Sequence, residues 1–480
     1  MYRLRISLST FILKFKMFVS THKLIYKFIG LMVVIIVVFF AWTPTVNAIS
    51  RQLDIRRFNN MPREHMIYDF EYLMTALEEN WPFFNLSLSA NNIDVRALAD
   101  YMRILLRDPA TPINCPIDFL DIMQIHFFEP IGQLGHLRQE TSCERYFATR
   151  TQFQFLVEQF LTNAHNRTTV HINNLYNRPE VVLFYSRLRD TGRGSLPHTF
   201  NEPVMTFGKI EAGRTAYIKV NRMIDMADDI MSSVDPRMWH YEHLMYLFNQ
   251  DIEGYENLII DFRGNPGGRS GHFRALIMPM LLQNGVTFSA YVFYMDGKYA
   301  NQAREVFDVR NLYRFWLQAD WNYYFDEPIM QIRHFTEPLP YLDMNISFAY
   351  SFESRLDIEV VYHYYGFMAS AREEVLFDGK IWVLIDENTA SAAEAIVAVL
   401  KYNSIATVVG EPTFGIFGID HEAIAVNMSL PNTGILIRFD VAYYTDLYGR
   451  PLQGYGIQPH YFNRSGMDAL ETVLAMIAEE

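Results

Sequence analysis

Two short segments of this chain of 480 residues combine residue types that serve nucleophilic chemistry. The first, ENTASAAEAIVAVLKY, has the pattern of a helix whose first turn is kept small around Ser391. A serine there has its Oγ beside free backbone N–H groups and the positive end of the helix dipole, which favour developing negative charge. Small residues also allow close helix packing without any chemistry. This segment alone therefore leaves both a nucleophilic and a packing role open for Ser391.

The second segment, DFRGNPGGRSGHF, follows an apolar run and contains a turn that ends in Gly267 and Gly268. Two adjacent glycines let backbone N–H groups face a reacting carbonyl without obstruction by side chains. A turn of this composition is also commonly no more than a turn. It lacks the lysine and the hydroxyl residue of a phosphate-binding loop, which argues against nucleotide binding at this point.

Three further residues could take part in chemistry. His240 and His243 lie one turn apart on a predicted helix, a spacing that can chelate zinc. No third ligand is identifiable, so we predict no metal and no cofactor. Lys401 ends the helix that Ser391 begins and lies about 15 Å from it by helical rise, too far to act as a base.

The elements that must position these residues indicate an α/β core. Continuously apolar runs at 256–262 and 381–386 are typical of strands that are covered on both faces. Each run leads into a small-residue turn and then a helical pattern, an alternation that implies parallel strands. Further strands are predicted at 215–220 and 286–294.

Outside this core the pattern predicts helices, a hairpin and a connecting segment. Three helices are expected over 68–82, 95–107 and 116–128. Near the C-terminus, two apolar runs flank the turn at 431–434 as a β-hairpin, and an amphipathic helix follows at 466–479. We therefore divide the chain into a signal peptide or membrane anchor (1–48), an N-terminal helical module (49–145), a connecting segment with two weak strands (146–210) and an α/β core (211–480).

Composition excludes several classes of protein. Half of the residues are hydrophobic, so the chain must bury a large core. The formal net charge of −13 argues against nucleic acid as a partner, because phosphates require a basic face. The two cysteines, Cys115 and Cys143, cannot form a disulfide scaffold. They bracket the third predicted helix and form either one disulfide or two unpaired thiols.

The N-terminus has the order of a targeting segment. The first 27 residues carry six basic residues and no acid, and an uninterrupted apolar run follows at 28–42. Val46 and Ala48 are small residues at the spacing that signal peptidase requires. This order describes a secretory signal, with an uncleaved membrane anchor as the alternative. In both cases we expect the remainder to be extracytoplasmic, either secreted or tethered by this segment, with no other membrane contact.

Three motifs, IIDFRGNPGG, NTASAAE and VVGEPTFG, resemble in this order the core of the tail-specific (C-terminal-processing) serine peptidase family. Weaker similarity to the branch related to tricorn protease and interphotoreceptor retinoid-binding protein covers the helix at 68–82, the Gly135-His136 pair, the hairpin and YGIQP at 455–459. The resemblance implies a crotonase-like α/β core, a serine nucleophile, an oxyanion hole and a peptide or protein substrate.

The resemblance assigns roles to individual residues. Ser391 matches the nucleophile, and the N–H groups of Ala392 and of Gly267 or Gly268 match the oxyanion hole. The family often carries a peptide-binding PDZ module before the core. Residues 146–205 contain no recognisable carboxylate-binding glycine loop, so we predict that this module is absent or degenerate.

The general base is matched less directly. In the lysine branch of the family it stands directly after the Thr-Phe-Gly turn, where this chain has Ile416, so the usual serine–lysine pair is ruled out. In the tricorn-like branch it is the histidine of a Gly-His pair, here His136, and an imidazole with an ordinary pKa of about 6.5 suits proton transfer at neutral pH. That branch orients the histidine with a glutamate. The matching residue is Gln453, and Asp446 and Glu422 are nearby carboxylates that could replace it.

Two functions from different classes follow. The first is an exported or membrane-tethered serine endopeptidase with Ser391 as nucleophile and His136 as base. Replacing the orienting carboxylate of a triad by its amide can cost about 10⁴ in turnover. The second function is therefore a catalytically impaired peptidase fold that binds a peptide or an apolar ligand. A carboxylate within hydrogen-bond reach of His136 would favour the enzyme, and its absence the binding protein. The sequence predicts no particular oligomeric state.

Overall fold

The computed structural model describes residues 52–132, 134–140, 178–191, 203–223, 244, 247–268, 273, 277, 281, 286–303, 322–325, 346–356, 377–417, 425–446 and 448–480. The chain divides into two compact units, Met1–Met61 and Pro62–Glu480. Residues 52–59 of the first unit are helical. The predicted signal or anchor at 1–48 is outside the described residues. Among those that are described, no helix is long and apolar enough to cross a membrane.

The second unit begins with a group of helices, and the three predicted ones are all present. Their bounds are α2 (Arg63–Asn80), α3 (Phe84–Asn91), α4 (Val95–Arg107) and α5 (Pro116–Met123), followed by the π-helical turn η1 (Gln124–Phe128), α6 (Glu129–Ile131) and the 3₁₀ turn η2 (Leu134–His136). Asp94 begins α4 by accepting hydrogen bonds from the N–H groups of Arg96 and Ala97. Pro116 begins α5, at the helical position that tolerates its missing N–H.

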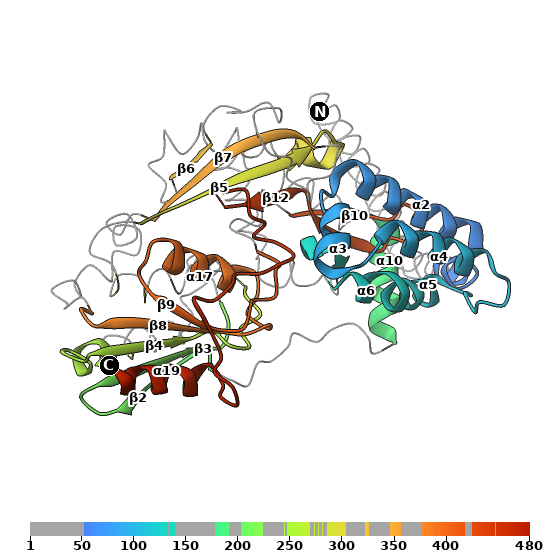
Figure 1. Cartoon of the computed structure of the whole chain (residues 1–480). Helices are drawn as coiled ribbons and strands as arrows, with labels where there is room; N and C mark the ends of the chain where they lie inside the picture. The colour runs from blue at the N-terminus through green and yellow to red at the C-terminus, as the bar shows by residue number, and fades with distance from the viewer. Residues whose placement is uncertain are drawn as a thin grey trace, which may run out of the picture. The chain divides into compact units, whose positions relative to one another are not determined.

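A six-stranded sheet forms the core of the second unit. Its strands are β2 (Met205–Glu211), β3 (Thr215–Val220), β4 (Asn257–Asp261), β8 (Lys380–Ile385), β9 (Thr407–Gly410) and β13 (Tyr461–Phe462), in the order β13-β9-β8-β4-β3-β2. All neighbours are parallel except β2 and β3. Helices α17 (Ala392–Tyr402) and α19 (Ala469–Glu479) lie on opposite faces of this sheet (Figure 1). The predicted mixed α/β fold with mostly parallel strands is confirmed.

Coverage on both faces explains why the central strands are continuously apolar. Ile259 of β4 and Trp382 of β8 belong to a buried cluster that includes Val473 and Ile477 of α19. The alternate residues Ile260 and Val383 are equally buried on the other face. Side chains of a strand alternate between faces, so both sets must be apolar when helices cover both.

The described part of the second unit also contains two antiparallel sheets. The four-stranded sheet has the order β12-β5-β7-β6 and contains β5 (Val286–Met295), β6 (Asn322–Phe325), β7 (Ile346–Leu356) and β12 (Ala442–Thr445). The three-stranded sheet has the order β1-β11-β10 and contains β1 (Arg138–Gln139), β10 (Ala425–Ser429) and β11 (Leu436–Asp440). Only Val441 separates β11 from β12, so the chain passes directly from one sheet to the other after Asp440.

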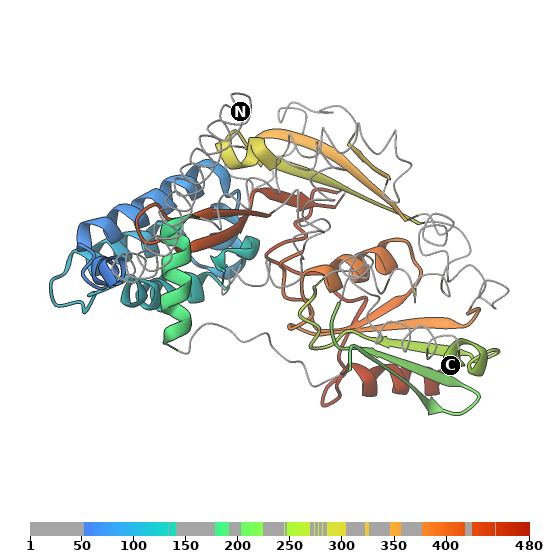
Figure 2. The same cartoon turned by 180° about the vertical axis from the view of Figure 1, so that it is seen from behind.

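The described part of the connecting segment differs from the weak strands expected there. It contains a helix, α10 (Pro179–Asp190), in addition to β2. Figure 2 shows α10 beside the N-terminal helices. The hydroxyl of Tyr185 on α10 donates to the carbonyl of Glu140 and accepts from the N–H of Leu436, so α10 spans the ends of β1 and β11. Its apolar positions follow a helical period that the flanking polar residues obscure.

Buried polar contacts fasten the N-terminal helices to the strands. The carboxylate of Asp69 on α2 accepts hydrogen bonds from the N–H groups of Asn432 and Thr433 in the β10–β11 turn. Asn80, at the end of α2, accepts from the N–H groups of Tyr299 and Ala300. These contacts hold α2 against the β10–β11 turn and against the helical residues that follow β5.

Candidate active site

Ser391 lies at the N-terminus of α17 in a strained backbone conformation. Its φ is 55° and its ψ is −118°, values that a residue with a side chain rarely adopts. Such conformations cost about 1–3 kcal/mol and persist where the surroundings determine them. The next residue, Ala392, begins the helix, so its N–H has no partner within the helix. The predicted position of the serine at a helix N-terminus is confirmed.

His136 also has a positive φ, of 48°, and follows Gly135 with a φ of 57°. A Cβ at Gly135 would lie 2.7 Å from the rings of Trp81 and Phe83, so only glycine fits. Phe83 in turn packs on Tyr443 of β12, with ring centroids 5.7 Å apart. The Gly-His pair is thus explained by aromatic packing that turns the imidazole toward the core.

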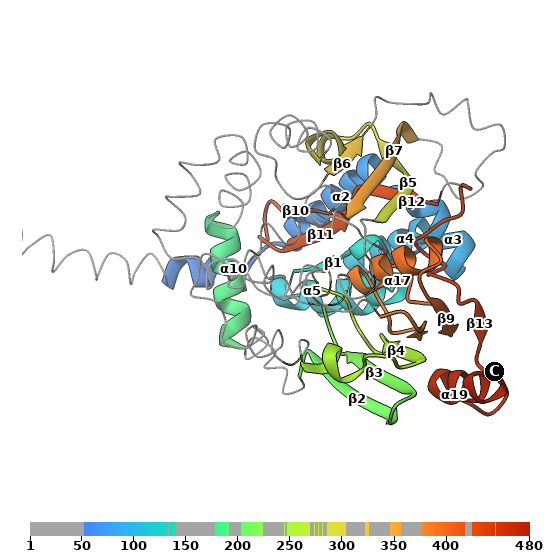
Figure 3. The same cartoon turned by 90° about the vertical axis from the view of Figure 1, so that its left-hand side faces the viewer.

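Three buried side chains, Ser391, His136 and Asp440, form one chain of contacts. The His136 Nε2 atom lies 3.2 Å from Ser391 Oγ, and its Nδ1 atom lies 2.7 Å from Asp440 Oδ2. Figure 3 labels the two elements concerned, α17, whose N-cap is Ser391, and β1, which follows His136. Asp440 is fully buried, and its Oδ1 has no hydrogen-bond partner among the described residues.

The register of β1 and β11 explains how Asp440 reaches His136. The two strands pair antiparallel, with Arg138 opposite Arg438. Continuing this register by two residues in each direction brings position 136 opposite position 440. Two residues along a strand return to the same face, so Asp440 occupies the side of the sheet that Arg438 does.

Two of the residues expected to orient His136, Gln453 and Asp446, make other contacts, and Asp440 contacts Nδ1 instead, which corrects the prediction from the sequence. Gln453 accepts a hydrogen bond from the N–H of Tyr444 through its side-chain oxygen, at 3.0 Å. Asp446 pairs with Arg450, with 2.6 Å between Oδ2 and Nε. Glu422 is among the residues that the structure does not describe. Asp440 was missed because β1 has only two residues, too few to reveal a pairing by pattern.

Of the two glycines of the NPGG turn, Gly267 lies against Ser391 and Gly268 lies against Met223. A Cβ at Gly267 would lie 2.6 Å from the Ala390 carbonyl oxygen and 2.7 Å from Ser391 Cβ. The N–H of Gly267, however, donates to the side-chain oxygen of Asn265 at 2.9 Å, so this N–H already has an acceptor. Gly268 forms a parallel bridge with Met223. The absence of a side chain at Gly267 therefore serves the close approach of the two turns.

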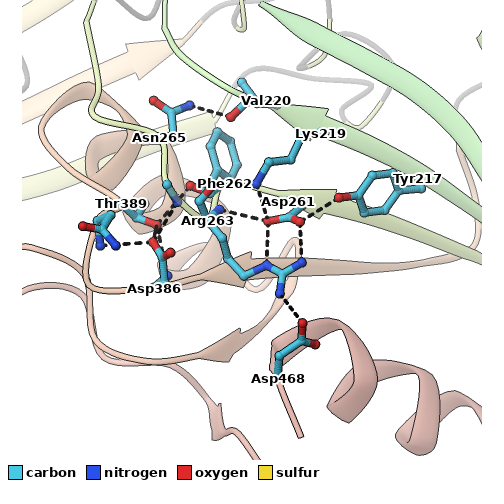
Figure 4. Close-up of polar contacts among 12 residues, drawn as sticks. Tyr217, Lys219, Val220, Asp261, Phe262, Arg263, Asn265, Asp386, Thr389 and Asp468 are labelled. Carbon is cyan, nitrogen blue, oxygen red and sulfur yellow. Dashed lines mark hydrogen bonds and ion pairs between the residues drawn. The ribbon is translucent and has the colours of Figure 1, made fainter. Parts of the chain in front are cut away.

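A polar network fixes the strand end before the NPGG turn (Figure 4). The buried carboxylate of Asp261 contacts Arg263 at 2.7 Å, the Tyr217 hydroxyl at 2.7 Å and Lys219 at 3.2 Å. Burial raises the pKa of Asp261, but these partners outweigh it and hold the pKa below its usual value. Arg263 also contacts Asp468 at the start of α19, at 2.9 Å. The network ties the turn to two strands and a helix.

A second set of contacts joins the NPGG turn to the turn that holds Ser391. Asp386 accepts from the N–H of Gly264 and from the hydroxyl of Thr389 (Figure 4). The Ala390 N–H donates to the Asn265 carbonyl at 2.9 Å. The two motifs that stand far apart in the sequence are thereby held as one backbone unit.

Two other candidates from the sequence that the structure describes, Ile416 and Lys401, provide no base for Ser391. Ile416 presents an alkyl side chain where the lysine branch has its base, and Lys401 contacts the Gln458 carbonyl instead. His240, His243 and Cys143 fall in segments that the structure leaves undescribed. Among the described residues, no group of three His, Cys, Asp or Glu side chains is placed to bind a metal ion.

Comparison with known proteins gives a family match. The model of peptidase family S41 matches residues 214–462. A search of curated proteins gave no match. Among solved structures, a candidate peptidase from Parabacteroides merdae is 16% identical, with a TM-score of 0.44 over 86% of this chain and 95% of its own. Mature CPAF is 19% identical, with a TM-score of 0.33 over 54% of this chain and 49% of its own. The photosystem II D1 C-terminal processing protease is 15% identical, with a TM-score of 0.29 over 55% and 49%.

Proposed function

This chain belongs to peptidase family S41, a family of serine-type hydrolases, and from that premise we propose that it is an endopeptidase that uses Ser391, His136 and Asp440. Ser391 Oγ is the nucleophile and His136 Nε2 its general base. Asp440 holds the Nδ1–H of His136 and stabilises the imidazolium. Its substrates are peptides or proteins.

The first half of the reaction forms an acyl-enzyme. Ser391 Oγ attacks the carbonyl carbon of the scissile peptide bond as His136 Nε2 takes the hydroxyl proton. The Ala392 N–H, at the positive end of α17, stabilises the oxyanion, and Gly268 is the second predicted donor. The tetrahedral intermediate collapses when the C–N bond breaks and His136 returns the proton to the leaving amine.

The second half regenerates the enzyme. His136 Nε2 takes a proton from a water molecule, which attacks the ester carbonyl. When the bond to Ser391 Oγ breaks, the serine recovers its proton from His136 and the new carboxylate leaves. The fixed contact of Asp440 with Nδ1 keeps Nε2 as the atom that exchanges protons in both halves.

The single observation that carries this proposal is the 2.7 Å contact between His136 Nδ1 and Asp440 Oδ2. The sequence left a binding protein open because the family's orienting glutamate is Gln453 here. A carboxylate at hydrogen-bond distance from His136 removes the reason to expect an impaired site. The observation therefore favours the hydrolase over a ligand-binding protein.

Three finer assignments belong to the same proposal. The core is of the crotonase-like type, and β10 and β11 form its C-terminal hairpin. The chain is exported, because the basic start and the apolar run at 28–42 have the order of a signal or anchor. Substrates are selected without a PDZ module. Cell fractionation tests the export assignment. Finding the protein only in the cytoplasmic fraction would contradict it.

The test of the activity is proteolysis of an unfolded protein substrate by the full-length chain. Ser391→Ala is expected to abolish cleavage while the variant stays folded. Ser404→Ala is a matched control, because Ser404 is exposed and also has a φ of 55°, beyond the other end of α17. It should cleave at the wild-type rate. Full cleavage by Ser391→Ala would contradict the proposal.

A further inference from the structure

Glu394 is a fully buried carboxylate one turn after Ser391. Its Oε2 accepts hydrogen bonds from the N–H groups of Ser391 at 2.8 Å and Ile416 at 3.0 Å. Its Oε1 accepts from the hydroxyl of Thr413 at 2.6 Å and the N–H of Gly415 at 2.8 Å. One side chain thus joins the nucleophile to a loop that follows it by about twenty residues.

The four contacts match the ionised form of the acid. A carboxylate offers about four acceptor sites, and all four partners of Glu394 are donors. A neutral carboxyl would lose a contact if its hydrogen faced one of the three N–H groups, and it would keep all four only by donating to the Thr413 hydroxyl. Burial raises the pKa of Glu394 to about 7, against the lowering effect of the hydrogen bonds. Burial therefore makes the ionisation of Glu394 costly, and the four hydrogen-bond donors around it offset that cost.

The loop that Glu394 binds is itself fastened on both sides. The Phe414 N–H donates to the carbonyl of Thr389, two residues before Ser391, at 2.9 Å. Thr413 Oγ1 accepts from the Ile457 N–H at 2.6 Å. The loop at 413–416 therefore lies between the Ser391 turn and the segment at 454–457. Glu394 is the side chain of α17 that binds this loop.

An ordinary helix cap would not need this arrangement, and α19 shows the difference within the same chain. There Glu471 occupies the same third position of the helix and accepts from the N–H of Asp468 at 2.9 Å. Glu471 is exposed, and its carboxylate closes the cap. Glu394 makes the same contact to Ser391 but adds three others in a fully buried place.

We propose that Glu394 is a positioning residue for the nucleophile, whose carboxylate clamps the Ser391 backbone and the loop at 413–416 in one arrangement. This keeps the strained turn at a φ of 55° and Ser391 Oγ within reach of His136. The inference rests on the proposed role of Ser391. In the lysine branch this loop leads into the base, whereas here Ile416 supplies a backbone N–H to Glu394.

The experiment measures labelling of the full-length chain by a serine-reactive phosphonate, with the protein in mild detergent because of its apolar run. It yields the limiting rate of labelling and the half-saturating concentration. Glu394→Gln replaces an acceptor oxygen by an NH₂ that faces donors. We expect its limiting rate to fall about 10²-fold, as small misplacements of reacting groups do, with little change in half-saturation.

Two controls separate positioning from stability alone. Glu471→Gln repeats the substitution in a cap without the loop. Asp69→Asn repeats it in a fully buried carboxylate that also has four donor contacts, two from Asn432 and two from Thr433, away from Ser391. Both variants should lower the thermal stability. Both should leave the limiting rate of labelling close to that of the wild type.

Thr413 gives a second route should Glu394→Gln fail to fold. Thr413→Val removes the hydroxyl that contacts Glu394 and should slow labelling about tenfold, less than Glu394→Gln, because Glu394 keeps its three N–H partners. Thr413→Ser keeps the hydroxyl and should restore the rate. Folded Glu394→Gln labelled at the wild-type rate, or equal rates for the two Thr413 variants, would overturn the positioning role. No labelling of Ser391 in the wild type would instead contradict the proposed function itself.

Discussion

The two sides of the candidate site are built in different ways. The Ser391 side is held by contacts within and between two sequence motifs, at Asp261 to Gly268 and at Asp386 to Ser391. The His136 side joins residues that are 304 positions apart in the sequence. Its geometry comes from the pairing of β1 with β11 and from aromatic packing on Gly135.

This difference teaches where a motif determines geometry and where it does not. On the Ser391 side, backbone conformation is the functional feature, and it requires particular glycines and short polar side chains at fixed spacing. On the His136 side, only a carboxylate opposite the imidazole is required. Here Asp440 of β11 provides this carboxylate. Gln453 has an amide instead, and its oxygen accepts a hydrogen bond from the N–H of Tyr444.

The largest expected effect is on the His136 side. Asp440→Asn keeps the size of the side chain but removes the charge and the fixed tautomer, and should lower turnover by about 10⁴. Asp446→Asn is the matched control, since Asp446 is also buried but pairs with Arg450. It should lower turnover far less. Steady-state cleavage of a peptide substrate measures both, and equal losses would contradict the assignment of Asp440.

The next effect is on the Ser391 side. Gly267→Ala places a Cβ 2.6 Å from the Ala390 carbonyl oxygen, so the nucleophile turn must shift. We expect turnover to fall about 10²-fold, because displacements of this size misplace the reacting groups. Gly264→Ala is the control. Gly264 also has a positive φ, of 74°, but its Cβ would meet nothing within 4 Å. If both variants retain turnover, close approach at Gly267 is not needed.

A smaller effect on turnover, but a measurable one on stability, is expected at Asp261. Asp261→Asn leaves Arg263 and Lys219 without their buried partner and should lower the free energy of unfolding by about 3 kcal/mol at pH 7. The pKa of Asp261 is lowered in the folded protein. Its contribution is therefore present above the unfolded pKa of about 3.9 and is lost as the pH falls below it.

Urea unfolding at pH 7 and pH 3 checks this prediction. The difference between wild type and Asp261→Asn should shrink at pH 3. Glu256→Gln is the control, because Glu256 forms an exposed pair with Arg214 and should have little effect at either pH. A difference at Asp261 that is independent of pH would mean that packing, and not charge, stabilises the network.

Much of the fold and half of the site could be predicted from the sequence. The strand at 215–220 and the helix at 95–107 have the predicted bounds, because an apolar period over six or more residues is a local signal. Ser391, the two glycines and Ala392 are likewise encoded within short motifs, and His136 follows the glycine that its packing requires.

The remainder could not be predicted because it depends on tertiary contacts. β1 has two residues, so neither its existence nor its register could be inferred, and Asp440 was not considered. The hydrogen bond from the Gly267 N–H to the Asn265 side chain is a contact within a turn, and the spacing of the motif residues does not reveal it. The four contacts of Glu394 require the loop at 413–416 to fold back onto α17.

The measurement that tests the central claim most directly is a double-mutant cycle on turnover with His136→Ala, Asp440→Asn and the two combined. If Asp440 acts through His136, removing the histidine already removes the benefit of the carboxylate, since members of a catalytic unit are not additive. The account predicts that the double variant cleaves no more slowly than His136→Ala alone. Losses that multiply would contradict it, because Asp440 would then act independently of His136.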